Sequence, residues 1–165
     1  MSRTYQAPLL AAVAVLAPLA ANAGPTDDAR LRALEARFAA AVEARDIDAI
    51  MKVYSAEVFV FDVVPPRQYV GAAAYRDDWK SFLAGFSGAI RFKITDLAVS
   101  SQGPVGYGHS IQHVSGTDPQ GKPVDLTVRV TDVYRRQGGA WKIVQEHVSV
   151  PVDLATGKAD LASKP

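Results

Sequence analysis

The pattern of apolar and polar residues changes about halfway along the chain. In the first half, apolar residues recur at spacings of three and four, as in Leu31, Leu34 and Phe38, which is typical of amphipathic helices. In the second half, apolar and polar residues alternate, which is the period of a strand with one buried face. The first pattern predicts three helices, over residues 27–45, 47–54 and 72–86.

Aspartates lie at the start of two of these helices. We expect Asp27 and Asp28 to cap the first helix and Asp46 to cap the second, because their carboxylates accept hydrogen bonds from free backbone N–H groups.

The alternating segments predict a sheet that follows the helices. The last two segments flank Gly138-Gly139, and a glycine pair is typical of tight hairpin turns, which need positive φ. Helices followed by long antiparallel strands predict an α+β fold, with the helices packed in the concavity of a curved sheet. The strands are expected over residues 57–63, 90–99, 105–114, 124–134 and 141–150.

The register of this last hairpin divides its residues between two faces. Counted from the turn, Tyr134 lies opposite Ile143 and Asp132 lies opposite Gln145, and opposed residues share a face. One face is then apolar near the turn and polar beyond it, which suits a ligand pocket. This pocket face comprises Trp141, Ile143, Tyr134, Asp132, Gln145, His147 and Ser149; the other face comprises Arg129, Thr131, Val133, Val144, Glu146 and Val148.

The N-terminus has the features of an export signal. Arg3 precedes an apolar run over residues 7–20, and Ala21-Asn-Ala23 supplies a cleavage site with small residues. We therefore expect residues 1–23 to be a signal peptide and the protein to be periplasmic or secreted; an uncleaved N-terminal anchor is the alternative. Residues 24–153 are expected to form one domain and residues 154–165 a flexible tail.

The charge balance excludes some partners. Of 18 basic and 17 acidic residues, the mature chain loses only Arg3, which leaves 17 of each. Without a basic run, neither nucleic acid nor an anionic membrane surface is expected as a partner. The chain has no cysteine, so the apolar core must hold the fold without disulfides.

Several segments together resemble the nuclear transport factor 2-like superfamily, specifically its SnoaL-like and ketosteroid-isomerase-like members. The matching segments are residues 44–55, Val60-Phe-Asp62, residues 69–79 and residues 139–151, and the last also resembles the association domain of calcium/calmodulin-dependent protein kinase II. The resemblance implies a cone-shaped sheet wrapped around three helices. It also implies a homodimer through the convex sheet face, where we expect Arg129 and Glu146 to pair.

The resemblance gives Asp62 a catalytic interpretation. In ketosteroid isomerases an aspartate at the matching place is the general base, a role that needs an apolar pocket to raise its pKa. The alternative is an aspartate that bonds the Pro65-Pro66 turn or Arg67. These enzymes also use a tyrosine in the first helix to bind the developing oxyanion. The matching residue here is Phe38, which has no hydroxyl, so another donor such as His109 or Tyr107 would have to replace it.

Two histidines are further candidates for catalysis. Strand alternation places His109 and His147 on the concave side, and the kinase association domain carries a pocket arginine at the position that matches His109. Histidine titrates near neutral pH and serves as acid, base or carboxylate ligand; the alternative is a neutral core histidine bonded to Ser149 or Asp132. The residues expected to contact a ligand are Tyr54, Tyr69, Trp79, Tyr107, Asp132, Gln145 and Ser149, with Trp79 also suited to the core.

No metal or cofactor is expected. His109, His113 and His147 lack the short spacings of zinc ligands, and Ser149 lacks the Gly-x-Ser-x-Gly motif of a nucleophile. Three functions remain open. The domain is a cofactor-free enzyme that transfers a proton within a small, partly apolar molecule, as an isomerase or dehydratase does; it binds such a molecule without turnover; or it is a dimerising module.

Overall fold

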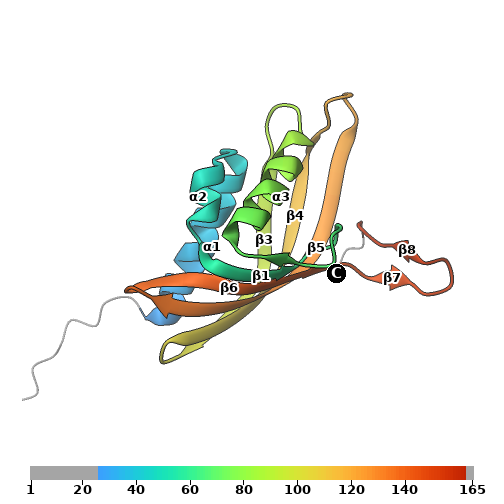
Figure 1. Cartoon of the computed structure of the whole chain (residues 1–165). Coiled ribbons are helices and arrows are strands. Elements are labelled where there is room, and N and C mark those ends of the chain that lie inside the picture. The colour runs from blue at the N-terminus through green and yellow to red at the C-terminus, as the bar shows by residue number, and fades with distance from the viewer. Residues whose placement is uncertain (1–25, 163–165) are drawn as a thin grey trace, which may run out of the picture.

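Helices precede a curved sheet in the part of the chain that the computed structural model describes, residues 26–162. The expected signal peptide, residues 1–23, lies outside the described residues. The helices lie on one side of a six-stranded sheet (Figure 1), which confirms the α+β fold. The helices are α1 (Asp27–Glu43), α2 (Ile47–Met51) and α3 (Ala72–Ala84); the strands are β1 (Tyr54–Phe61), β2 (Tyr69–Val70), β3 (Arg91–Gln102), β4 (Val105–Thr117), β5 (Pro123–Gln137) and β6 (Ala140–Ser149).

The strand order is β2-β1-β6-β5-β4-β3. Strands β3 to β6 are joined by hairpins and pair antiparallel, whereas β1 and β6 pair parallel. The sheet is thus mixed, where the alternation predicted an antiparallel one. The reason is the connection: α3 and four further strands, β2 to β5, separate β1 from β6, so the chain returns to β1 in the same direction.

Caps fix the helix starts. Thr26, rather than Asp27 or Asp28, caps α1, since its hydroxyl accepts a hydrogen bond of 3.2 Å from the Ala29 N–H. Asp46 caps α2 as expected, with bonds of 3.1 and 2.9 Å from the next backbone N–H groups. Helix α2 ends at Met51, and Tyr54 opens β1 instead of closing the helix.

The β5–β6 hairpin turns at Gly138-Gly139 as predicted, with φ of 56° and 83°. Its register then shifts between Val133 and Tyr134, because β6 carries one extra residue there. Tyr134 still pairs with Ile143, but Asp132 pairs with Glu146 instead of Gln145. A one-residue shift moves every later side chain to the other face. Beyond the bulge, Glu146 and Val148 therefore lie on the inner face, and Gln145, His147 and Ser149 follow the outer one.

Strand β4 also presents the face opposite to the expected one. Tyr107 and His109 are exposed, and the alternate residues of the strand are buried. The cause is close packing: a Cβ on Gly106 would lie 2.9 Å from the Leu31 side chain, and one on Gly108 would lie 2.9 Å from the Tyr134 hydroxyl oxygen. Only glycine fits where α1 and β5 approach β4 this closely.

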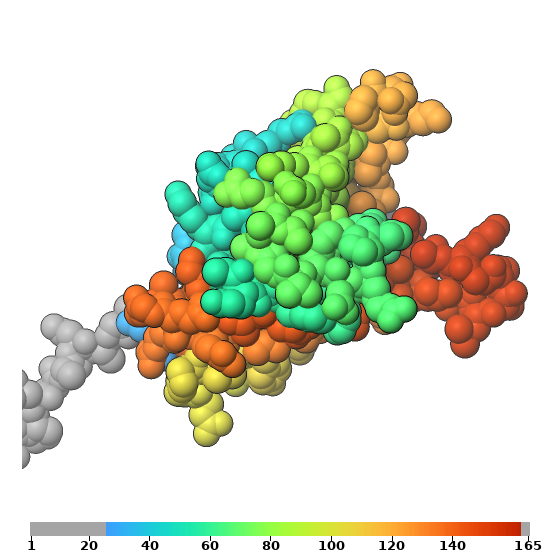
Figure 2. All heavy atoms as spheres, in the orientation of Figure 1, coloured from blue at the N-terminus to red at the C-terminus, as the bar shows by residue number. Residues whose placement is uncertain are grey.

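The C-terminal segment forms a small hairpin, β7 (Val152–Asp153) with β8 (Lys158–Ala159), which projects from the body of the molecule (Figure 2). Residues 154–162 thus contain regular structure, and the Thr127 N–H donates to the Leu161 carbonyl at 2.8 Å. The flexibility expected of this tail stays a prediction. Within residues 26–162, no helix has the length and apolar character to cross a membrane.

Candidate functional site

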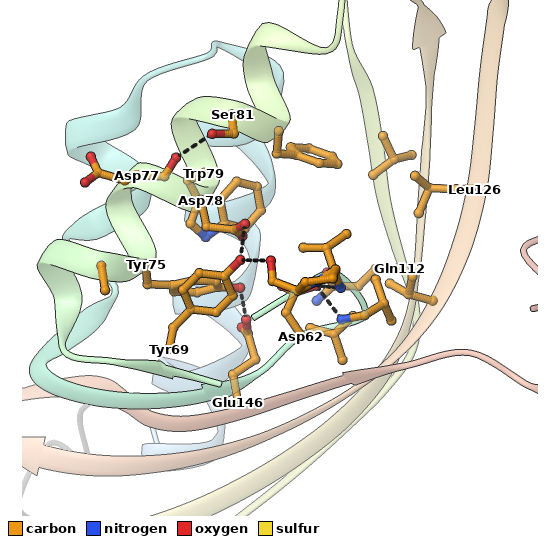
Figure 3. A pocket seen from close by; sticks show the side chains of 18 of the residues that line it. Asp62, Tyr69, Tyr75, Asp77, Asp78, Trp79, Ser81, Gln112, Leu126 and Glu146 are labelled. Carbon is orange, nitrogen blue, oxygen red and sulfur yellow. Dashed lines mark hydrogen bonds between the residues drawn. The ribbon is translucent and has the colours of Figure 1, made fainter. Parts of the chain in front are cut away.

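A cavity of about 630 Å³ lies between α3 and the inner face of the sheet (Figure 3). Helix α3 forms one wall, strands β3 to β6 form the other, and the segment after β1 borders both. Most of the lining is apolar, as in small-molecule sites. Its aromatic residues are Phe38, Tyr69, Tyr75, Trp79, Phe82 and Phe92.

Glu146 is the most buried carboxyl of this cavity, with 3% of its surface exposed. The Tyr54 hydroxyl donates to Oε2 at 3.0 Å and the Tyr75 hydroxyl donates to Oε1. Burial raises the pKa of Glu146 to about 7; the two tyrosine bonds lower it, and the nearby Asp62 charge raises it. Glu146 thus changes its charge near neutral pH, which is a requirement for a general base.

Two more carboxyls lie behind Glu146, away from the cavity. Asp132 faces Glu146 across the β5–β6 ladder, and its Oδ1 has no hydrogen-bond partner among the described residues. Burial, then the charge of Glu146, raises the pKa of Asp132 well above its usual value. Glu35 accepts a bond of 2.8 Å from the Tyr134 hydroxyl, and burial raises its pKa to about 7. The charge of Glu35 therefore adds to the cost of ionising Glu146, and the charge of Glu146 in turn favours the protonated form of Asp132.

Asp62 and Asp78 line a less buried part of the cavity. Asp62 directly follows β1 and accepts bonds from the backbone N–H groups of Val63 and Val64. Its pKa is raised by burial and then by the charge of Asp78. Asp78 accepts a bond of 2.7 Å from the Tyr69 hydroxyl, and burial raises its pKa as well. The cavity thus holds carboxyls that repel one another when ionised.

Gln112 supplies a neutral polar group on the sheet side. It lies on the inner face of β4, is 6% exposed and lines the cavity (Figure 3). Its side-chain amide bonds none of the described residues. A buried amide without a protein partner is available to a ligand as both donor and acceptor.

The structure brings together only some of the residues predicted from the sequence. Asp62, Tyr69 and Trp79 line the cavity. Tyr54 and Asp132 lie behind it: Tyr54 donates a hydrogen bond to Glu146, and Asp132 is paired with Glu146 across the β5–β6 ladder. The prediction that the other site residues lie on the inner face is wrong, because the bulge of β6 and the close packing at the glycines of β4 turn them to the outer face. The residues placed on the outer face instead are Tyr107, His109, Gln145, His147 and Ser149.

The expected pair of Arg129 and Glu146 is also wrong. Arg129 is exposed on the outer face, whereas Glu146 points inward to the two tyrosines. On the outer face, His147 instead packs against Phe61, with ring centroids 5.7 Å apart. His113 forms an exposed ion pair of 3.0 Å with Asp125.

Sequence reasoning missed several residues of the site. Tyr75, Asp78 and Phe82 follow one another at helical spacing, so the face of α3 that carries Tyr75 and Trp79 could have included Asp78. Gln112 follows Gly106 and Gly108 in the alternation of β4, and two small residues in alternate positions signal close packing on that face. No signal identifies Glu146, because the bulge that turns it inward is invisible in the alternation.

No metal site is evident in the described segment. Among residues 26–162, no group of three or more His, Cys, Asp or Glu is arranged to hold a metal ion. The groups that face the cavity are carboxyls, phenols, an amide, a serine hydroxyl and aromatic rings.

Comparisons with known proteins agree with this architecture. The model of a SnoaL-like domain family matches residues 31–153, and no curated protein matches the chain. An NTF2-like protein of unknown function from Pseudomonas putida KT2440 is 31% identical, with a TM-score of 0.76 over 84% of this chain and 96% of that one.

More distant structures share the fold. A nuclear transport factor 2 (NTF2-like) superfamily protein from Salmonella enterica serovar Typhimurium is 15% identical, with a TM-score of 0.67 over 79% of this chain and 94% of that one. A ketosteroid isomerase-like protein from Erwinia carotovora atroseptica is also 15% identical, with a TM-score of 0.64 over 74% and 95% of the two chains. The chain therefore belongs to the SnoaL-like domain family of the NTF2-like superfamily.

Proposed function

We propose that this protein binds a small, partly apolar molecule in the cavity and moves a proton within it, as an isomerase does, with Glu146 as the base. The observation that carries this proposal is a cavity carboxyl, buried and held by two phenols, whose pKa is about 7. A base with a pKa near the working pH combines a useful ionised fraction with a strong affinity for the proton.

The proton inventory of this reaction balances without a cofactor. Ionised Glu146 takes a proton from a carbon that lies between a carbonyl and a carbon–carbon double bond, and the electron pair moves to the carbonyl oxygen to give a dienolate. Protonated Glu146 then returns the proton to the far carbon of the former double bond, so that the double bond shifts into conjugation with the re-formed carbonyl. Gln112, whose amide has no hydrogen-bond partner among residues 26–162, donates to the enolate oxygen and takes the place of the tyrosine absent at Phe38.

Exchange in heavy water tests this step with a simple ketone. We expect the protein to accelerate the incorporation of deuterium next to the carbonyl of 4-phenylbutan-2-one, measured by NMR. Glu146→Gln should slow this exchange by about a hundredfold or more. Glu57→Gln is the matched control, because Glu57 is an exposed glutamate of β1 that does not line the cavity. Equal exchange rates for Glu146→Gln and the unaltered protein would show that Glu146 is not the base.

We further propose that the protein is exported and acts as a homodimer. Export is supported by the signal-like sequence of residues 1–23, and dimerisation by the exposed aromatic and apolar residues of the outer sheet face, among them Phe61 and Tyr107. N-terminal sequencing of the exported protein should begin at Gly24. A mature chain that still begins at Met1 would contradict cleavage.

A further inference from the structure

The charges that line the cavity all have one sign. Four carboxyls line it, and its lining contains no lysine, arginine or histidine. Asp77 is exposed and is neutralised by Lys80 at 3.0 Å. The other three, Asp62, Asp78 and Glu146, are stabilised by neutral phenols and backbone N–H groups, and no ion pair involves them among the described residues.

These three carboxyls act on one another. The charge of Asp78 raises the pKa of Asp62, and the charge of Asp62 raises that of Glu146. All three groups line the same cavity. Figure 3 shows Asp78 with Tyr69, Glu146 with Tyr75, and Asp62 near both pairs. A positive charge in this space would relieve the repulsion, and a negative charge would increase it.

The apolar part of the lining is also suited to a cation. Six aromatic rings border the cavity, and ring faces attract ammonium groups in addition to excluding water. The free amide of Gln112 offers a hydrogen bond to a neutral polar group elsewhere on the ligand.

We propose that the cavity selects an amine: a small molecule with an apolar body and a protonated nitrogen, which lies between Asp62 and Asp78. Molecules that carry a carboxylate, sulfate or phosphate are rejected, because no cation of the lining could neutralise them. This inference rests on the proposed function only in taking the cavity as the ligand site. It leaves Glu146 free for the proton transfer.

Calorimetric titration with three matched probes tests the selectivity. The probes are 4-phenylbutylamine, 4-phenylbutan-1-ol and 4-phenylbutanoate, which differ in charge but share their apolar part. At pH 8.5 we expect the amine to bind about tenfold or more tightly than the alcohol, and the alcohol more tightly than the carboxylate. Binding of the carboxylate as tight as that of the amine would overturn the inference.

Variants that replace an aspartate by asparagine test which carboxyls cause the preference for amines. Asp78→Asn and Asp62→Asn each keep a hydrogen-bond acceptor and remove the charge, so each should reduce the preference for amine over alcohol by about threefold or more. Asp77→Asn, which removes one charge from the same helix at a position already paired with Lys80, is the control and should change the preference least. An unchanged preference in both Asp78→Asn and Asp62→Asn would overturn the inference.

The outcomes separate this inference from the proposed function. If the three probes bind equally, the selectivity is wrong while the proton transfer by Glu146 still stands or falls by deuterium exchange. If none of the probes binds, the amine selectivity is wrong, and deuterium exchange with 4-phenylbutan-2-one still decides the proton transfer. If the amine binds best but no exchange occurs with any ketone, the cavity binds amines without turnover.

Discussion

Tyr54 on β1 donates a hydrogen bond of 3.0 Å to Oε2 of Glu146 on β6, the strand that pairs parallel with β1. Tyr75 of α3 donates to the other carboxylate oxygen. The Tyr75 bond connects α3 to the sheet, and the Tyr54 bond connects two neighbouring strands within the sheet. They also set the chemistry of the site, because each one lowers the pKa of a carboxyl that burial raises.

Replacement of Tyr54 by phenylalanine should destabilise the protein more at pH 8.5 than at pH 5. At pH 8.5 the variant leaves a buried ionised carboxylate with one donor fewer, which costs about 1–3 kcal/mol in the free energy of unfolding. At pH 5 Glu146 is protonated and depends less on that donor. Urea denaturation at the two pH values measures the difference; an equal loss at both would show that the phenol does not stabilise the ionised form.

The stability of the protein should fall as pH rises from about 5 to 8. In the folded state Glu146 and Glu35 have pKa values of about 7, above their ordinary value of 4.5. Between these values the folded state binds more protons than the unfolded state, so the free energy of unfolding decreases by up to about 1.4 kcal/mol per pH unit for each retained proton. The stabilisation that these two carboxyls provide is fully present below pH 4.5 and is lost above pH 7.

Glu146→Gln should reduce this slope, because glutamine does not titrate. The matched control is Glu57→Gln, at an exposed glutamate of β1, which should leave the slope unchanged. The free energy of unfolding from urea melts across the pH range gives both slopes. A Glu146→Gln variant as dependent on pH as the unaltered protein would show that Glu146 is ionised normally in the folded state.

Gly108→Ala should lower the free energy of unfolding by about 1–3 kcal/mol, through overpacking. The new Cβ would lie 2.9 Å from the Tyr134 hydroxyl oxygen and 3.1 Å from the Val99 side chain, both inside the core. The same clash pushes the hydroxyl of Tyr134 away from Glu35. Thermal and urea melts check the loss, and a variant as stable as the unaltered protein would show that β4 and β5 have room to separate.

Thr131→Arg should convert the proposed dimer to a monomer. Thr131 is exposed and pairs with His109 on one side and His147 on the other, so a long charged side chain there stands in the middle of the outer face. Val152→Arg is the control, since Val152 is exposed in the C-terminal hairpin. Sedimentation velocity at micromolar concentration distinguishes the species; a monomeric unaltered protein would refute the dimer.

Alternation of apolar and polar residues identifies the strands of this protein but does not fix which of their faces points inward. The three helices, the five longer strands and the Gly138-Gly139 turn were predictable, because each depends on local spacing or on backbone freedom. The two-residue strands β2, β7 and β8 were not predicted. Asp62 was placed in the pocket from resemblance, and it lines the cavity. These features need no knowledge of how one strand is offset from the next.

Which residues face inward on β4 and β6 was not predictable in the same way. On β6, one extra residue at Val144 shifts the register, so that Glu146 instead of His147 lies on the inner face. Nothing in the pattern of apolar residues marks this insertion. On β4, alternation and the resemblance place Tyr107 and His109 on the concave side, but α1 and β5 pack closely against Gly106 and Gly108, which puts those glycines on the inner face instead. The candidate site changes from paired histidines to coupled carboxyls as a result.

The pKa of Glu146 is the quantity on which the account depends most directly. Carbon-detected NMR of the glutamate side-chain carboxyls, with Glu146→Gln to assign the resonance, follows its titration between pH 4 and 9. We expect a midpoint near 7, with the same resonance shifting when 4-phenylbutylamine is added. A midpoint near the ordinary glutamate value of 4.5 would contradict the assignment of Glu146 as a base that works near neutral pH.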